Sequence, residues 1–358
     1  MYIEEIKLHN FRNYEEQKIE LNKNINIFYG ENAQGKTNII ESIFLCAYAK
    51  SFRTSKDKEI INLNKNEASV TLKYQKKDRE GTIRVNISDK KYIYLNDIKA
   101  KKMSEILGNL NVVIFSPDDI NILKDGPQKR RRFLDMMIGQ LRPNYIHCLN
   151  IYLKVLEQRN NYLRQIKEQN KSEDLLEIWD EKLAEYAIIV YRYRYEFINK
   201  IKEVINEIHC KITDNKENLE LNYISECDNK EKFIELLKQR RKLDIIKGYT
   251  TKGVHRDDFN IFINNKEVSV YGSQGQNRTV VLSLKLAELQ VIKDDIDDYP
   301  ILLLDDFMSE LDSNRRKSFL NNIENTQVII TCTDPIEIEK FNKNVEYKLY
   351  NVKKGEVF

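Results

Sequence analysis

Residues 25–37 read INIFYGENAQGKT, and this stretch decides the fold prediction. Its first five residues are mostly apolar, as in a buried strand, and they lead into the pattern GxxxxGK(S/T) and then into helically spaced apolar residues. Strand, glycine-rich loop and helix in this order indicate a P-loop, whose backbone N–H groups face phosphate oxygens at a helix N-terminus. The predicted nucleotide-binding residues are Gly30, Glu31, Asn32, Ala33, Gln34, Gly35, Lys36 and Thr37.

Two side chains of this loop have predicted roles in ATP chemistry. Lys36 is expected to meet the β and γ phosphates, and the Thr37 hydroxyl to ligate Mg²⁺. The second carboxylate that such a site needs follows the apolar run 301–304, which is typical of a central strand buried on both faces. Asp305 is expected to hold Mg²⁺ through water. Asp306 is placed as the general base for the attacking water, so Asp306 and Lys36 are the predicted catalytic residues.

Two further segments separate this P-loop from those of kinases and GTPases. Ser273-Gln274-Gly275-Gln276 precedes an amphipathic helix, so Ser273, Gly275 and Gln276 are predicted to form a second phosphate site at its N-terminus. Taken alone, this segment is equally typical of an ordinary capped helix. Ser309-Glu310-Leu311-Asp312 follows the carboxylate strand, and the sequence has no Asn-Lys-x-Asp element that would read guanine.

The order of the segments predicts an α/β head interrupted by a mainly helical insert. A chain of 358 residues is long enough for two compact units. Apolar residues at helical spacing between 179 and 208 indicate a long helix packed on a partner helix, to which residues 149–163 contribute. We therefore expect a discontinuous P-loop ATPase head at 1–125 and 248–358, with a helical arm at 126–247.

Composition excludes several classes of protein. No apolar run approaches the ~18 residues of a membrane-spanning helix, so no membrane association is expected. The five cysteines are scattered without a CxxC pair, so we expect free thiols rather than disulfides or a zinc site. Net charge is only +3. Any nucleic-acid contact must therefore come from how the charge is distributed.

Basic residues concentrate in two stretches. Residues 124–164 hold nine Lys or Arg against three acids, and residues 73–102 hold ten against four, a local excess of six in each. Such patches fit phosphate neutralisation, and Tyr92 and Tyr94 are placed to stack on bases. Solvated surface lysines explain the same pattern equally well. The candidate DNA contacts are Lys129, Arg130, Arg131 and Arg132.

Eight motifs in order resemble the ABC-type heads of SMC-like chromosome and repair proteins, and more narrowly the RecF family. They are LHNFRNY at 8–14, GENAQGKT at 30–37, SFRT at 51–54, FSPDD at 115–119, GPQKRRRFLD at 126–135, HRDD at 255–258, SQGQNRT at 273–279 and DDFMSELD at 305–312. The resemblance extends over nearly the whole chain.

The resemblance implies a cytoplasmic, slow, DNA-dependent ATPase that forms an ATP-dependent homodimer on single-stranded and duplex DNA, including gaps. It implies RecR and RecO as partners and RecA indirectly, in DNA repair, replication and the SOS response. In such a dimer each ATP lies between the P-loop of one subunit and the Ser273 segment of the other. Two departures matter: Asp306 stands where most ABC proteins have Glu, and Thr331-Cys332-Thr333-Asp334 stands where many have a His.

Two alternatives remain at this point. Another SMC-like ABC ATPase would require a longer coiled coil than the ~45 Å that residues 179–208 span at ~1.5 Å per residue. An adaptor that binds ATP without turnover is disfavoured by the intact Lys36, Thr37, Asp305 and Asp306. HRDD at 255–258 could approach the nucleotide or only close a loop.

Overall fold

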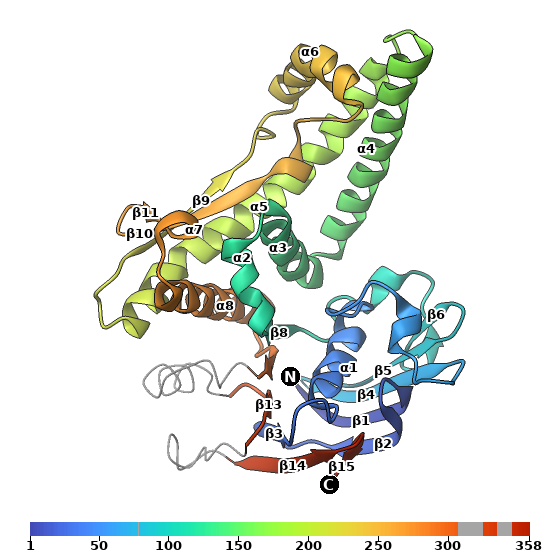
Figure 1. The fold of residues 1–358 in the computed structure, drawn as a ribbon, viewed down its shortest axis with the longest axis vertical. Helices are drawn as coiled ribbons and strands as arrows, with labels where there is room; N and C mark the ends of the chain where they lie inside the picture. Colours follow the sequence, from blue (N-terminus) through green and yellow to red (C-terminus); the bar gives the residue numbers. More distant parts are fainter. Residues whose placement is uncertain (78, 307–324, 335–345) are drawn as a thin grey trace. The chain divides into compact units, whose positions relative to one another are not determined.

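The chain folds into two compact units (Figure 1). The computed structural model describes residues 1–77, 79–306, 325–334 and 346–358. The first unit contains residues Met1–Asp119 and Lys285–Phe358, and the second contains Ile120–Leu284. Ser309-Glu310-Leu311-Asp312 lies outside the described residues.

The first unit is built on a mainly parallel sheet of order β15-β14-β3-β13-β12-β8. The strands are β15 (Glu356–Val357), β14 (Tyr347–Lys353), β3 (Ile25–Tyr29), β13 (Val328–Cys332), β12 (Ile301–Asp305) and β8 (Val112–Phe115). All residues of β12 and β13 are buried, which explains their continuous apolar sequence. Because β13 lies between β3 and β12 and all three are parallel, their carboxyl ends meet at one edge.

A second, antiparallel sheet in this unit has the order β2-β1-β4-β5-β6-β7. Its strands are β1 (Tyr2–Phe11), β2 (Tyr14–Glu20), β4 (Ala68–Lys76), β5 (Arg79–Ile87), β6 (Lys91–Leu95) and β7 (Ile98–Lys99). The helix α1 (Lys36–Tyr48) packs against strands of both sheets. This position explains why apolar residues occur on most of its faces, with ten of its thirteen residues buried.

The second unit is a helical arm with a small sheet. Its helices are α2 (Asn121–Lys124), α3 (Pro127–Leu141), α4 (Pro143–Gln169), α5 (Leu176–Ile212), α6 (Lys230–Lys247) and α7 (Val268–Tyr271), and α8 (Gln274–Ile296) begins here. The strands β9 (Leu219–Ile224), β10 (Asp258–Ile263) and β11 (Lys266–Glu267) pair in the order β11-β10-β9. Of the short 3₁₀ turns, η1 (Asp57–Ile60) and η2 (Met103–Ile106) lie in the first unit, η3 (Pro117–Ile120) crosses into the second, and η4 (Val254–Arg256) lies in the second.

The predicted long helix and its partner are α5 and α4, which lie side by side in Figure 1. The buried stripe of α5 includes the predicted Leu183, Val190, Phe197 and Ile201, all with no exposed surface. It also includes polar residues that apolar periodicity does not find, namely Asp180, Arg194 and His209.

The boundary expected at residue 247 differs from the one in the structure. Residues 248–284 were expected in the head, but they belong to the second unit. The physical reason is pairing: β10 forms an antiparallel ladder with β9, from Asp258 opposite Ile224 to Ile263 opposite Leu219. The strands β10 and β11 therefore belong to the small sheet of the arm.

Buried ion pairs tie the arm together. The Arg159 guanidinium, with no exposed surface, donates to Asp180 at 2.7 Å and to Asp244 at 2.9 Å. Arg194 donates to Asp135 at 2.9 Å and to Asp257 at 3.1 Å. Buried charges are tolerated when they are paired in this way, so removing one partner of either pair would leave an uncompensated charge and destabilise the arm.

The thiols are as predicted from their spacing. All five cysteines are free, and four of them are buried. Burial raises the pKa of the Cys46 thiol, so it behaves as a small apolar side chain. Within the described ranges, no helix is long and apolar enough to cross a membrane.

Candidate nucleotide site

The loop between β3 and α1 has the backbone that its glycines permit. Gly30 has φ 153° and Gly35 has φ 117°, and Ala33 between them is also left-handed with φ 64°. A Cβ on Gly30 would lie 2.4 Å from the Val352 carbonyl oxygen, and one on Gly35 would lie 2.7 Å from Asn13 Nδ2. No larger residue fits at either position, because both conformation and space exclude it.

Lys36 reaches back over this loop. Its Nζ donates to the Gly30 carbonyl at 2.6 Å and to the Glu31 carbonyl at 2.8 Å, and only 4% of the residue is exposed. The ammonium group thus lies inside the curve of the loop, at the N-terminus of α1. A buried ammonium group and the free backbone N–H groups of a helix N-terminus together supply the positive charge and the hydrogen-bond donors that bind a phosphate group.

The metal side of the site joins three segments of the chain. Thr37 Oγ1 donates to Asp305 Oδ1 at 2.9 Å, and Thr331 Oγ1 donates to the same oxygen at 2.9 Å. Burial raises the pKa of Asp305, while these two hydroxyl groups act in the opposite direction. A carboxylate beside a threonine hydroxyl fits Mg²⁺, which prefers oxygen ligands and keeps several waters. Among the described residues, no cluster of three or more His, Cys, Asp or Glu offers another metal site.

Asp306 adopts a conformation that is uncommon for an aspartate. Its φ is 49°, in the left-handed region, and its backbone N–H donates to Thr331 Oγ1 at 3.0 Å. Left-handed backbone at a residue other than glycine costs free energy and concentrates at functional sites. The Thr331 hydroxyl thereby contacts both aspartates, a role that was not predicted from the sequence.

Three residues without a predicted role support the P-loop from outside. Asn13 Nδ2 donates to the Gln34 carbonyl at 2.8 Å, and Tyr14 OH donates to the Gly35 carbonyl at 3.1 Å. On another side, the Gly355 N–H donates to the same Gln34 carbonyl at 3.1 Å. The motif at 8–14 was the available signal for the first two residues. For Gly355 the sequence offered none.

A buried carboxylate anchors α1 one turn after Thr37. Glu41, with no exposed surface, receives two bonds from Arg12, from Nε at 2.9 Å and from Nη2 at 2.6 Å. Arg53 lies 3.4 Å from the same carboxylate, and the Ser51 hydroxyl donates to it. The motifs at 8–14 and 51–54 therefore converge on one residue of the P-loop helix. A bidentate arginine pair of this kind fixes orientation as well as charge.

The second predicted phosphate site lies in the other unit. Ser273 Oγ accepts from the Gln276 N–H at 3.2 Å, and Gln276 Oε1 accepts from the Ser273 N–H at 3.0 Å, which is a reciprocal capping box. Gln276 also donates to Glu217 at 2.8 Å. The predicted cap is present, and Ser273 itself is exposed. Gly275 follows it in the first turn of α8.

The four candidate DNA contacts on α3 divide into two pairs. Arg130 donates to both oxygens of Asp258, at 2.5 Å and 2.9 Å, and Arg131 donates to the Asp257 carbonyl at 2.8 Å. Lys129 and Arg132 are exposed. Two of the four cations are therefore held in arm packing, and two face solvent.

HRDD at 255–258 has a structural position in the arm. His255 Nδ1 accepts from Tyr152 OH at 2.6 Å and its Nε2 donates to the Thr250 carbonyl at 3.1 Å. Asp257 accepts from Arg194, and Asp258 accepts from Arg130. These contacts join α3, α4 and α5 to the start of β10, so the motif closes the arm's polar core.

Comparison with known proteins gives a consistent result. The model of the family described as RecF/RecN/SMC N terminal domain matches residues 2–356. A protein named DNA replication and repair protein RecF from Clostridium perfringens (strain SM101 / Type A) is 48% identical over 339 residues, covering 93% of each chain. The protein of that name from Clostridium botulinum (strain ATCC 19397 / Type A) is 45% identical over 363 residues, covering 100% of this chain and 99% of its own.

Solved structures match over the same length. The recombination mediator protein RecF with ATP, described as part of the RecFOR pathway, is 38% identical with a TM-score of 0.93, covering 100% of this chain and 97% of its own. An Smc head bound to the C-winged helix domain of ScpA is 20% identical with a TM-score of 0.59, covering 100% and 96%, which supports the fold alone. The predicted α/β ABC-type ATPase head is confirmed.

Proposed function

Since the chain belongs to the RecF/RecN/SMC N-terminal domain family, we propose that it is an ATP-dependent DNA-binding protein of replication and repair. One observation carries the nucleotide part of this proposal. The P-loop Thr37 and the strand-end Asp305, 268 residues apart, share a hydrogen bond of 2.9 Å. A P-loop without that carboxylate could bind phosphate but would lack a complete magnesium site.

The residues of the site have distinct proposed roles. The backbone N–H groups of residues 30–37 and the Lys36 ammonium bind the β and γ phosphates. Thr37 would hold Mg²⁺ directly and Asp305 would hold it through water, and the metal would neutralise charge on the phosphate oxygens. Bound ATP would supply the phosphoanhydride bond that is cleaved. Asp306 orients the attacking water and accepts its proton.

We propose that turnover is slow and stimulated by DNA. The side chain of Asp306 is one methylene shorter than the glutamate usual in ABC proteins, so it holds the water less closely. The segment Thr331-Cys332-Thr333-Asp334 stands where many ABC proteins have a His, so a hydroxyl takes the place of the imidazole. Slow hydrolysis suits a switch, in which the lifetime of the ATP-bound state matters more than product formation.

The Ser273 segment is proposed to complete the site of a second copy. Its capping box presents the exposed Ser273 hydroxyl at the N-terminus of α8, where the helix dipole favours an anion. Two ATP molecules would then join two chains into a dimer, with Gly275 and Gln276 beside the same γ phosphate.

The wider role follows from the similar proteins. Their names describe DNA replication and repair and a recombination mediator of the RecFOR pathway. We propose the same process here: a cytoplasmic dimer on duplex and single-stranded DNA at gaps, acting with RecR and RecO to support RecA loading and the SOS response. Lys129 and Arg132 are the proposed phosphate contacts on α3.

Sedimentation with ATP and Mg²⁺ tests this function. Ser273→Arg should leave each monomer able to bind ATP but unable to dimerise or hydrolyse it, because a long cation enters a closely packed position. Asp306→Asn should accumulate the dimer, because ATP persists. An undisturbed dimer for Ser273→Arg, or a monomer for Asp306→Asn, would contradict the switch while leaving the P-loop assignment intact.

A further inference from the structure

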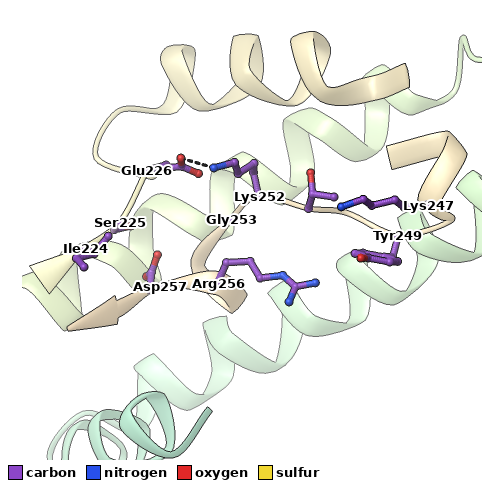
Figure 2. Close-up of a pocket in the computed structure, with 10 residues that line it drawn as sticks. Ile224, Ser225, Glu226, Lys247, Tyr249, Lys252, Gly253, Arg256 and Asp257 are labelled. Carbon is purple, nitrogen blue, oxygen red and sulfur yellow. Dashed lines mark hydrogen bonds and ion pairs between the residues drawn. The ribbon is translucent and has the colours of Figure 1, made fainter. Parts of the chain in front are cut away.

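We infer that the arm carries a binding site for single-stranded nucleic acid, in a cavity at the end of α6 (Figure 2). This arm pocket has a volume of about 390 Å³, within the ~300–1,000 Å³ typical of ligand sites. Its lining includes Glu226, Lys247, Tyr249, Lys252, Arg256 and Asp257. The inference rests on the proposed DNA-binding function and names the form of DNA that the arm would hold.

Hydrogen bonds within the arm fix the turn that forms one wall of the arm pocket. The helix α6 ends at Gly248, in left-handed conformation with φ 71°, and its N–H donates to the Asp244 carbonyl at 2.8 Å. The Asp244 side chain then accepts from the Thr251 N–H at 3.0 Å. Lys247 and Tyr249 are thereby placed on either side of a fixed turn, so little ordering is needed on binding.

The carboxylates that line the arm pocket do not pair with two of its cations. Asp257 is only 3% exposed, and it accepts from Arg194 at 3.1 Å and from Tyr223 OH at 2.5 Å. Glu226 accepts from Lys252 at 2.5 Å (Figure 2). Lys247 and Arg256 are exposed, and neither has a carboxylate partner in the part of the chain that the structure describes. The open part of the arm pocket is therefore positive and favours an anion.

The same two cations gather around an exposed aromatic ring. Tyr249 is 40% exposed, with the Arg256 guanidinium carbon 5.6 Å and Lys247 Nζ 6.0 Å from its ring centroid. In Figure 2 the Arg256 side chain extends toward Tyr249 from the opposite wall. Phosphate oxygens bind such cations, while bases stack on tyrosine rings and on guanidinium planes. The arm pocket thus offers contacts for both the phosphate and the base of a nucleotide.

A row of stacked tyrosines begins at the arm pocket. Tyr223, whose hydroxyl donates to Asp257, stacks on Tyr191 with centroids 5.9 Å apart, and Tyr191 stacks on Tyr195 at 5.6 Å. Tyr195 is 48% exposed. Burial raises the pKa of the Tyr191 phenol, and the nearby Asp228 and Asp257 carboxylates act in the same direction. Carboxylates beside this row repel phosphates, so the row is suited to bases.

These features favour a single strand over two other anionic ligands. In a duplex the bases are stacked on one another and their faces are not available, whereas a single strand can place an unstacked base in a concave site. An acidic peptide would use the two cations but has no reason to depend on Tyr249. Dependence on the aromatic ring is therefore the property that separates the candidates.

The test is fluorescence anisotropy of the full chain, with ATP and Mg²⁺ present, and with three labelled ligands. They are an oligo(dT) of about twelve nucleotides, within the ~4–16 that such sites cover, an abasic strand of equal length, and a duplex. We expect oligo(dT) to bind more tightly than the abasic strand. Tyr249→Ala should weaken oligo(dT) roughly tenfold and remove this difference, and Tyr249→Phe should preserve it. Lys247→Glu/Arg256→Glu should weaken oligo(dT) at least tenfold and reduce the salt slope by about 1.4, or ~0.7 for each lost phosphate contact.

The control is Lys230→Glu/Lys232→Glu, which makes the same charge change with two exposed lysines in the first turn of α6. It should leave oligo(dT) binding within about twofold, since long-range electrostatics alone are weakened by screening. Full oligo(dT) affinity in the Lys247/Arg256 variant would overturn the inference, as would an equal loss in the control. Duplex binding without oligo(dT) binding by the unmodified chain would overturn the arm pocket alone, whereas absence of both would also remove the proposed DNA-binding function. An oligo-glutamate peptide that competes fully with oligo(dT), with no effect of Tyr249→Ala, would assign the arm pocket to acidic protein segments.

Discussion

Thr37 and Asp305 share a hydrogen bond of 2.9 Å although 268 residues separate them. Thr37 lies in the first turn of α1, and Asp305 is the last residue of β12. The parallel pairing of β3, β13 and β12 brings the two residues to the same edge of the sheet. Thr331 at the end of β13 contacts the same carboxylate oxygen. The magnesium site is therefore a property of three adjacent strand ends, with the arm inserted between two of them in the sequence.

Replacing Lys36 by Ala tests the phosphate assignment. The ammonium that now bonds to the Gly30 and Glu31 carbonyls would be lost, so we expect ATP affinity to fall at least tenfold and hydrolysis to become undetectable. Lys36→Arg should retain part of the binding without turnover, because a planar guanidinium does not substitute for a compact ammonium. Calorimetric titration with ATP and a phosphate-release assay measure both. Near-normal hydrolysis by Lys36→Ala would contradict the site.

Thr331→Val tests whether one hydroxyl positions both aspartates. Thr331 has no exposed surface, and its hydroxyl contacts Asp305 and the Asp306 N–H. Removing it should cost about 1–3 kcal/mol of stability, the range for a lost buried hydrogen-bond partner. ATP hydrolysis should fall at least tenfold while ATP binding changes little.

Thr331→Ser is the matched control, because it keeps the hydroxyl and removes one methyl group. It should retain most of the hydrolysis. Chemical denaturation and single-turnover hydrolysis separate the two effects, and equal losses of activity in Val and Ser variants would show that packing rather than the hydroxyl matters.

The divided roles of the α3 cations give a third prediction. Lys129→Glu/Arg132→Glu should weaken DNA binding and its salt dependence without lowering the melting temperature, because both side chains are exposed. Arg130→Ala should instead destabilise the fold by about 2 kcal/mol, since Asp258 would lose its bidentate partner in a partly buried position. Thermal melts and DNA titrations of the two variants measure this separation. A stable Arg130→Ala variant that loses DNA binding would return Arg130 to the DNA surface.

His255 gives a prediction about pH. Burial lowers its pKa to about 4, with Arg256 and Arg131 acting in the same direction and the Thr250 carbonyl and Asp244 opposing. The unfolded histidine binds a proton near pH 6.5, whereas the folded one does so only near 4. Its contribution to stability is therefore complete above pH 6.5 and declines as pH falls from 6.5 to 4.

Comparison with His255→Gln isolates this contribution from carboxylates that titrate in the same range. The free energy of unfolding of the native chain should fall more steeply between pH 6.5 and 4.5 than that of the variant. Parallel pH profiles for the two proteins would show that His255 is protonated equally in both states.

Local sequence was sufficient for the elements of the head. A strand before the glycine-rich loop and a helix after it were predicted because these patterns are properties of adjacent residues. The structure has them at Ile25–Tyr29 and Lys36–Tyr48. The capping box at Ser273 and Gln276 is equally local, since its two bonds join residues three apart. The long helix followed from its apolar repeat, apart from its ends.

Tertiary structure decided what local pattern could not express. Arginine side chains are usually exposed, yet Arg159 and Arg194 are buried. Carboxylates from other segments of the chain lie close enough to neutralise them. Pairing between β9 and β10 places residues 248–284 in the arm. Arg130, a candidate DNA contact, instead forms an ion pair with Asp258. The sequence alone determined which residues could carry phosphate chemistry. Only the pairing of distant strands and the ion pairs in the core determined which basic side chains outside the P-loop are exposed and can bind a ligand.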